Sequence, residues 1–221
     1  MKILIKYLII STVFLIFFFF LYEKKIRTHH LEYNIQNSKE YITKSISHKG
    51  INLSNFKNII LGDSRSLNLN IKNSVNLSVG GQTLKLLIKN INSLDFPDSS
   101  NIIVNIGIND ILFSSPLTDV TSNFEKLVQI LDVKTIKSTF YFIEILPIND
   151  SGFFFQKEKV NSKVIIVNSF LKKIQNLEMN NYNFLPLEAL SENYSYFNDG
   201  IHLNLKGNRL FTSSVEDFIN E

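Results

Sequence analysis

Four short motifs place residues suited to acyl transfer in a fixed order along the chain. Ser64 offers a nucleophile, His202 offers a base, and Asp199 is a carboxylate three residues before that base. An asparagine and a glycine pair add side-chain and backbone N–H donors of the kind that stabilise an oxyanion. The motifs are Gly62-Asp63-Ser64, Gly80-Gly81, Gly107-Ile108-Asn109-Asp110 and Asp199-Gly200-Ile201-His202. Together they predict a site for nucleophilic acyl transfer.

Each motif alone also has a purely structural interpretation. The first would cap the helix that follows it, the second would form a tight turn, and the third would form an Asx turn. A single loop histidine such as His202 is more often a surface residue than a base. Ser66 also competes with Ser64 as the nucleophile, although it lies outside the motif. The ordered set of four motifs, rather than any one of them, favours the chemical interpretation.

Stretches of strand length alternate with stretches of helical period, which predicts an α/β fold with a mostly parallel sheet. Three motifs begin where an apolar run ends, and ligands bind beyond the carboxyl ends of parallel strands, so we expect the motifs to meet at one rim. Thr83 is a plausible N-cap for the first helical stripe, which begins at Leu84. The apolar runs are 58–61, 75–79, 101–106, 139–146 and 182–185, and the helical stripes are 84–91, 120–131, 160–174 and 210–219.

The N-terminal residues have the pattern of a membrane segment. Tyr7 to Tyr22 is apolar apart from a serine and a threonine, and a helix that begins at Ile3 would span about 30 Å. No small-residue cleavage site follows, so we expect an uncleaved signal anchor. Basic residues flank the segment on both sides; we expect a single-pass protein of the cytoplasmic membrane with its domain outside. The expected organisation is an anchor at 1–27, a stalk or lead-in segment at 28–50 and a catalytic domain at 51–221.

Composition excludes several other classes of function. The chain has 23 Lys and Arg against 20 Asp and Glu, and its basic residues are dispersed, so no nucleic-acid partner is indicated. The absence of cysteine removes disulfides, thiolate zinc sites and a cysteine nucleophile. No phosphate-binding glycine pattern follows the first strand. His29 and His30 have no further ligand nearby in sequence, so a solvated linker is expected there rather than a metal site.

The motifs resemble the blocks of the SGNH hydrolase superfamily, the GDSL-type esterases and lipases, from about Asn58 to the C-terminus. The resemblance implies a three-layer α/β/α sandwich with a five-stranded, flavodoxin-like sheet. It also implies that no cofactor or metal is required. One departure is Arg65, which stands where the family name implies leucine, at a position that varies and that we expect to affect the choice of substrate.

The resemblance also implies a role for each motif residue. Ser64 is the nucleophile, His202 the base, and Asp199 the residue that orients the base. The oxyanion hole consists of the N–H of Ser64, the N–H of Gly81 and the side chain of Asn109. Gly80 is the alternative to Gly81 as a donor, because the two glycines are adjacent.

The expected function is that of a membrane-anchored serine esterase that removes O-acetyl groups from cell-surface or secreted glycans. One alternative is a lysophospholipase or thioesterase acting on longer acyl chains, which Phe153, Phe154 and Phe155 would contact. Those phenylalanines equally fit the start of the core face of the helix at Val160. The other alternative is an anchored glycan-binding module without activity. Neither the acyl group, the alcohol nor the oligomeric state follows from the sequence.

Overall fold

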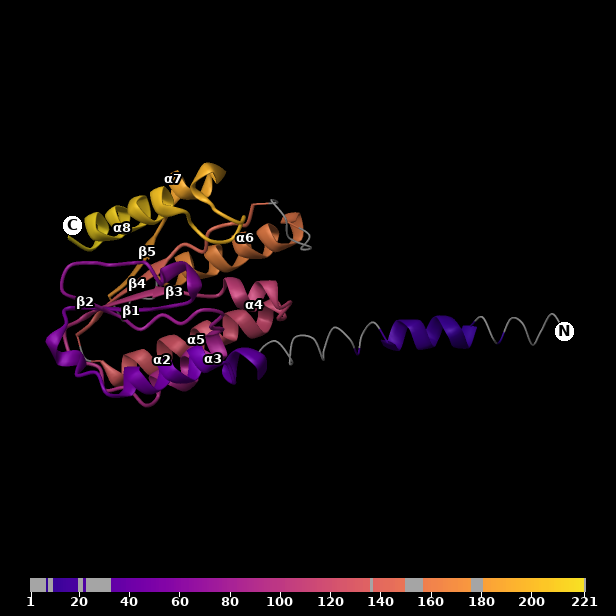
Figure 1. Cartoon of the computed structure of the whole chain (residues 1–221), viewed down its shortest axis with the longest axis horizontal. Helices are drawn as coiled ribbons and strands as arrows, with labels where there is room; N and C mark the ends of the chain where they lie inside the picture. The colour runs from indigo at the N-terminus through magenta and orange to yellow at the C-terminus, as the bar shows by residue number, and fades with distance from the viewer. Residues whose placement is uncertain are drawn as a thin grey trace.

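The fold is built on one parallel sheet of five strands in the order β2-β1-β3-β4-β5 (Figure 1). The computed structural model describes residues 7, 10–19, 22, 33–135, 137–149, 157–175 and 181–220. The strands are β1 Asn58–Gly62, β2 Ser74–Asn76, β3 Asn101–Asn105, β4 Thr139–Ile143 and β5 Tyr182–Leu185. The α/β class and the parallel five-stranded sheet that the sequence predicts are therefore confirmed.

Helices cover both faces of this sheet. In Figure 1, α2, α3 and α5 lie on one side of the strands, and α7 and α8 lie on the other. The helices are α2 Lys39–Lys49, α3 Leu84–Ile91, α4 Ile108–Leu112, α5 Leu117–Lys134, α6 Lys157–Ile174, α7 Glu188–Ser191 and α8 Leu205–Asn220. Short 3₁₀ turns lie at η1 Leu53–Asn55, η2 Ser64–Ser66 and η3 Tyr194–Tyr196.

Two apolar cores follow from the alternation of side chains along the strands. In β1, Ile59 and Leu61 face the larger core, which the apolar stripes of α3, α5 and α6 complete. Ile60 faces the smaller core, which contains residues of α7 and α8. All three β1 side chains are fully buried, as expected for a central strand covered on both faces.

The second strand is shorter than its apolar run predicts, and the residues after it position the glycine motif. β2 ends at Asn76, but Leu77 N–H donates to the Ile60 carbonyl at 2.8 Å, and Val79 N–H donates to the Gly62 carbonyl at 3.1 Å. The chain therefore stays beside β1 until Gly80, which brings the glycine pair to the end of β1.

Short-range patterns predict the start of α3 but not the two shortest helices. Thr83 is the N-cap of α3, as expected, with its side chain accepting from Leu86 N–H. The five-residue α4 and four-residue α7 are not predicted, because helices this short hold too few residues to show a period.

The predicted membrane segment Tyr7–Tyr22 lies partly outside the described residues, of which 10–19 are helical. Among the residues that the structure describes, no helix is both long enough and apolar enough to cross a membrane. The histidines at 29 and 30 and the phenylalanines at 153–155 also lie outside the described residues. In the segment 28–50, described from residue 33 onward, α2 packs against the domain through the buried Tyr41.

Candidate active site

The turn that carries Ser64 begins where β1 ends at Gly62. A Cβ on Gly62 would lie 2.5 Å from Ser66 Oγ and 2.6 Å from the Asn105 carbonyl oxygen, so this close approach requires glycine. Asp63 then caps η2, because its Oδ1 accepts from Arg65 N–H at 3.0 Å. Ser64 is the first residue of η2, at the carboxyl end of the sheet.

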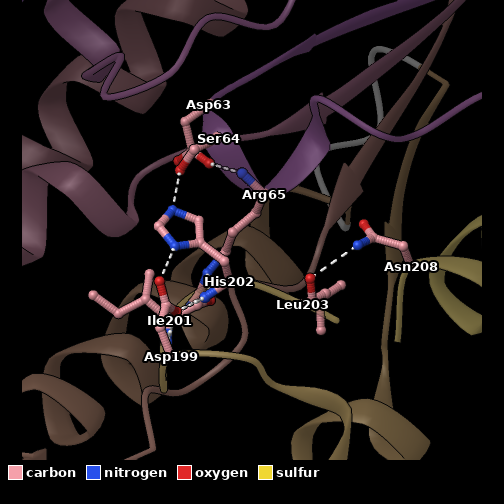
Figure 2. A network of polar contacts seen from close by, with 8 residues as sticks. All are labelled: Asp63, Ser64, Arg65, Asp199, Ile201, His202, Leu203 and Asn208. Atoms are coloured by element: carbon pink, nitrogen blue, oxygen red, sulfur yellow. Dashed lines mark hydrogen bonds and ion pairs between the residues drawn. The ribbon is translucent and has the colours of Figure 1, made fainter. Parts of the chain in front are cut away.

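The structure brings Ser64, His202 and Asp199 into one hydrogen-bonded line, although 138 positions separate the serine from the histidine (Figure 2). His202 Nε2 lies 3.0 Å from Ser64 Oγ, and His202 Nδ1 lies 2.6 Å from Asp199 Oδ2. With the Nδ1 proton donated to the carboxylate, Nε2 is left to accept the serine hydroxyl proton. This arrangement allows His202 to act as a general base toward Ser64.

A compact loop sets the direction of the carboxylate. Asp199 Oδ1 accepts from the backbone N–H groups of Ile201 at 3.0 Å and His202 at 2.7 Å, which leaves Oδ2 for the imidazole. Gly200 permits this loop by adopting a φ of +80°. Burial favours a higher pKa for Asp199, but the hydrogen bonds from His202 and Ile201 outweigh it and lower the pKa. The carboxylate is therefore ionised and able to orient the imidazole at neutral pH.

The predicted oxyanion donors lie on three separate turns. Within the described residues, neither the Ser64 N–H nor the Gly81 N–H donates to an acceptor in the loops and turns. The Asn109 amide is buried, and one of its hydrogens bonds the Gln82 carbonyl at 3.0 Å, so its second hydrogen is still able to donate. Gly81 has a φ of +73°, which a side chain would strain.

Asp110, in the third motif, forms hydrogen bonds to the helix that follows the second motif. Its carboxylate oxygens accept from Leu84 N–H at 3.0 and 3.3 Å, at the start of α3. A carboxylate at this end of a helix also interacts favourably with the helix dipole. The α4 turn that carries Asn109 is therefore tied to the helix that follows Gly81.

Arg65 is the structural residue of the site whose role the sequence did not reveal. It is 4% exposed, and its guanidinium donates to three backbone carbonyls: Ile201 at 3.0 Å, Pro147 at 3.3 Å and Leu146. We expected this residue to affect the choice of substrate, but its side chain points inward and bonds the backbone. Burial lowers the pKa of Arg65 to about 10, which leaves it charged at neutral pH.

The other polar residues of this turn, Ser66 and Asp63, are buried inside the protein. Ser66 is fully buried and donates to Asn105 Oδ1 at 2.8 Å, so it cannot compete with Ser64 for substrate. Complete burial raises the pKa of Asp63 to about 6, against the opposing effects of the Arg65 N–H, the Arg65 charge and His202. Among the described residues, no group of three or more His, Asp or Glu is placed to hold a metal ion.

Solved structures of other proteins have a similar fold. The fold is similar to a protein described as a platelet activating factor from Streptococcus pneumonia, with a TM-score of 0.71, 20% identity and coverage of 88% of this chain and 99% of the other. A GDSL-like lipase from Bacteroides thetaiotaomicron has a TM-score of 0.60 and 14% identity, covering 84% and 98% of the two chains. The fold is thus the one found in GDSL-like lipases, as the resemblance of the sequence motifs implies.

The family follows from the sequence itself. Residues 64–202, more than half of the chain, match the OSK domain, and the chain belongs to the OSK domain family. The OSK domain of Drosophila Oskar has the same fold, with a TM-score of 0.59, 15% identity and coverage of 86% of this chain and 100% of that one.

Longer proteins also contain a related sequence. N-acylneuraminate cytidylyltransferases of Streptococcus agalactiae are 26–28% identical to this chain in an alignment of 174 residues that covers 74% of it. The chain spans only 38% of the length of these relatives.

Proposed function

We propose that this chain is a serine ester hydrolase that removes O-acetyl groups from cell-surface or secreted glycans. The observation that carries the proposal is the 3.0 Å contact between Ser64 Oγ and His202 Nε2, with Asp199 2.6 Å from Nδ1 of the same ring. A hydroxyl, a base within hydrogen-bonding distance and a carboxylate that orients this base are the requirements for an activated serine nucleophile.

The reaction proceeds in two steps. Ser64 Oγ attacks the ester carbonyl carbon while His202 Nε2 takes the hydroxyl proton, and His202 then gives this proton to the leaving alcohol oxygen. In the second step His202 deprotonates a water molecule that attacks the acyl-serine, and the imidazolium then returns this proton to Ser64 Oγ as the acid leaves. Asp199 stays ionised throughout and stabilises the imidazolium that forms in each step.

The negative oxygen of each tetrahedral intermediate needs donors that are already in place. The backbone N–H groups of Ser64 and Gly81 and the free hydrogen of the Asn109 amide are proposed to fill this role. Among the described residues, the two backbone N–H groups donate to no acceptor in the loops and turns. The Asn109 amide is fixed in place by its hydrogen bond to the Gln82 carbonyl. Such donors interact strongly with charge because the protein does not have to reorganise during the reaction.

Two observations support a sugar as the alcohol and the cell surface as the location. The name of the Streptococcus agalactiae relatives refers to N-acylneuraminate, a sugar acid, and the sequence similarity covers 74% of this chain. The apolar residues from Tyr7 to Tyr22 are proposed to anchor the chain, with the domain outside the cytoplasmic membrane. An enzyme held there would meet the acetylated hydroxyls of surface glycans.

The first prediction tests the nucleophile. The full-length chain in detergent should hydrolyse p-nitrophenyl acetate faster than p-nitrophenyl palmitate and should release acetate from O-acetylated N-acylneuraminate. Ser64→Ala should reduce kcat by on the order of 10⁴–10⁶, because Ser64 is the hydroxyl that contacts the imidazole Nε2 among the described residues. Ser213→Ala, an exposed serine on α8, is the matched control and should leave kcat unchanged.

Three results would contradict parts of this proposal. A Ser64→Ala variant that keeps its activity would remove Ser64 as the nucleophile. A preference for palmitate would replace the acetylesterase with an enzyme for long acyl chains. A wild-type chain that hydrolyses none of these esters would leave the binding module as the better explanation.

A further inference from the structure

The turn that carries Gly81 is covered by residues that precede the first strand. A Cβ on Gly81 would lie 3.2 Å from Ile35 Cδ1 and 3.3 Å from Ile35 Cγ1, so the isoleucine lies directly against the glycine. Glu40 faces the neighbouring Gly80 in the same way, with its Oε1 3.7 Å from the position of a Cβ. The segment that contains both residues is described from residue 33 onward and lies outside the four motifs.

Ile35 is itself held in place by the start of α2. Its carbonyl accepts from Ser38 N–H at 3.0 Å and from Ser38 Oγ at 2.8 Å, and Ser38 caps α2 by accepting from Tyr41 N–H. Tyr41 is 5% exposed and packs with Val79, the residue before the glycine pair. Ile35 is therefore attached to a helix that contacts the same turn a second time.

Tyr41 also fastens α2 to the helix that follows the turn. Its hydroxyl donates to Asn90 Oδ1 at 3.1 Å, and its ring packs with Leu86, both residues of α3. Burial raises the pKa of Tyr41, so the phenol keeps the proton that this hydrogen bond needs. As a result α2, the glycine turn and α3 form one packed unit.

On its other side the glycine turn touches the proposed oxyanion donor Asn109. The Gln82 carbonyl accepts from Asn109 Nδ2, and Gln82 N–H closes the turn by donating to the Val79 carbonyl at 3.2 Å. The Gln82 side-chain oxygen is buried and has no hydrogen-bond partner among the described residues, so it does not hold the turn. The turn is thus held by Asn109 on one side and Ile35 on the other.

We infer that Ile35 is a positioning residue of the esterase site, which holds Gly81 where its N–H can stabilise the oxyanion. The inference rests on the proposed function, and it extends the active site to the segment 33–50, which the sequence suggests is only a stalk or lead-in. A glycine with φ of +73° and no Cβ packs little by itself. Its position therefore depends on a neighbour, and the neighbour in contact is Ile35.

The test compares Ile35→Ala with Ile46→Ala in the full-length chain. Ile46 is 65% exposed on α2, the helix to which Ile35 is attached, so its truncation changes that helix without touching the turn. Ile35→Ala should lower kcat for p-nitrophenyl acetate about tenfold with little change in KM, which is less than the 10²–10³ that loss of a whole oxyanion donor costs. Ile35→Leu should restore most of this loss, and Ile46→Ala should behave as wild type.

A second measurement does not depend on activity. Deuterium uptake by backbone amides of residues 77–86 should be faster in Ile35→Ala than in the wild type, and unchanged in Ile46→Ala. Equal uptake in all three proteins would overturn the inference, and so would an active Ile35→Ala enzyme with wild-type kcat. An inactive wild type would instead overturn the proposed function, and the uptake would still decide whether Ile35 holds the turn.

Discussion

At the scale of single residues, Arg65 links the turn that carries Ser64 to the loop that carries His202. Its backbone N–H donates to the Asp63 carboxylate. Its guanidinium donates to the carbonyl of Ile201, the residue before His202. A buried charge is costly unless its donors are satisfied, and here three carbonyls accept from it while the carboxylates of Asp63 and Asp199 add favourable charge. The guanidinium suits this role because its five N–H groups form a rigid fork.

The prediction at this scale concerns the geometry of that fork. Arg65→Lys keeps the charge but cannot reach all three carbonyls, so the His202 loop should shift relative to Ser64. We expect kcat to fall by roughly 10- to 100-fold, as for other small misplacements of reacting groups, with KM nearly unchanged. Steady-state kinetics on p-nitrophenyl acetate measures both. Arg209→Lys, at an exposed position of α8, is the control, and equal kcat in the two variants would contradict the role of Arg65.

At the scale of elements, the site is assembled from turns that follow strand ends. β1 leads into the Ser64 turn, the chain beyond β2 leads to Gly81, and β3 leads through Gly107 into α4, which carries Asn109. The parallel register aligns Gly62 of β1 with Asn105 of β3, so the first and third turns leave the sheet at the same level. Gly107 allows the chain to turn from β3 into α4 by adopting a φ of +115°.

The prediction at this scale replaces that glycine. In Gly107→Ala the new Cβ would lie 2.9 Å from Ile145 Cδ1 and 3.2 Å from Phe124 Cζ, in a backbone conformation that alanine disfavours. The free energy of unfolding should fall by about 1–3 kcal/mol. Because α4 would move with Asn109, kcat should fall as well, by at most the 10²–10³ expected for loss of one oxyanion donor.

Urea denaturation and kinetics of the same preparation measure the two effects. Gly50→Ala is the matched control, because Gly50 has a φ of −90° and its nearest neighbour would be 3.7 Å from the new Cβ. A Gly107→Ala protein as stable and as active as Gly50→Ala would show that this turn does not set the position of Asn109.

At the scale of the whole molecule, the fold keeps an ionisable carboxyl group in its interior. Asp63 is 1% exposed, its Oδ2 has no hydrogen-bond partner among the described residues, and burial raises its pKa from 3.8 to about 6. Between these two values the folded chain retains a proton that the unfolded chain has released. The contribution of Asp63 to the free energy of unfolding therefore decreases as the pH rises from 4 to 6.

The prediction at this scale compares wild type with Asp63→Asn. The amide oxygen of asparagine is still able to accept from Arg65 N–H, but the side chain no longer titrates. The free energy of unfolding of the wild type, minus that of the variant, should fall by about 2–3 kcal/mol between pH 4 and pH 7. Urea denaturation at several pH values measures it. Asp95→Asn, at an exposed position, is the control, and a pH-independent difference for Asp63→Asn would contradict the raised pKa.

Much of the architecture was predictable because it depends on patterns between near neighbours. Five apolar runs located the strands, and the stripes of α3, α5, α6 and α8 located the long helices. The limits of β2 and the existence of α4 were not predictable in this way. Pairing with β1 decides where β2 ends, and α4 is only five residues long.

The sequence by itself determined the fold class and the residue types of the candidate site, because periodicity and motif chemistry are local properties. Only the tertiary structure decided which of these groups meet. Ser64 and His202 are 138 positions apart, and Arg65 and Ile201 are 136 positions apart, so no short-range pattern records either contact. The contact of Ile35 with Gly81 likewise joins a segment before the first strand to a turn after the second. Such contacts arise from packing of the whole chain, which brings distant residues together only when the sheet and both its layers have formed.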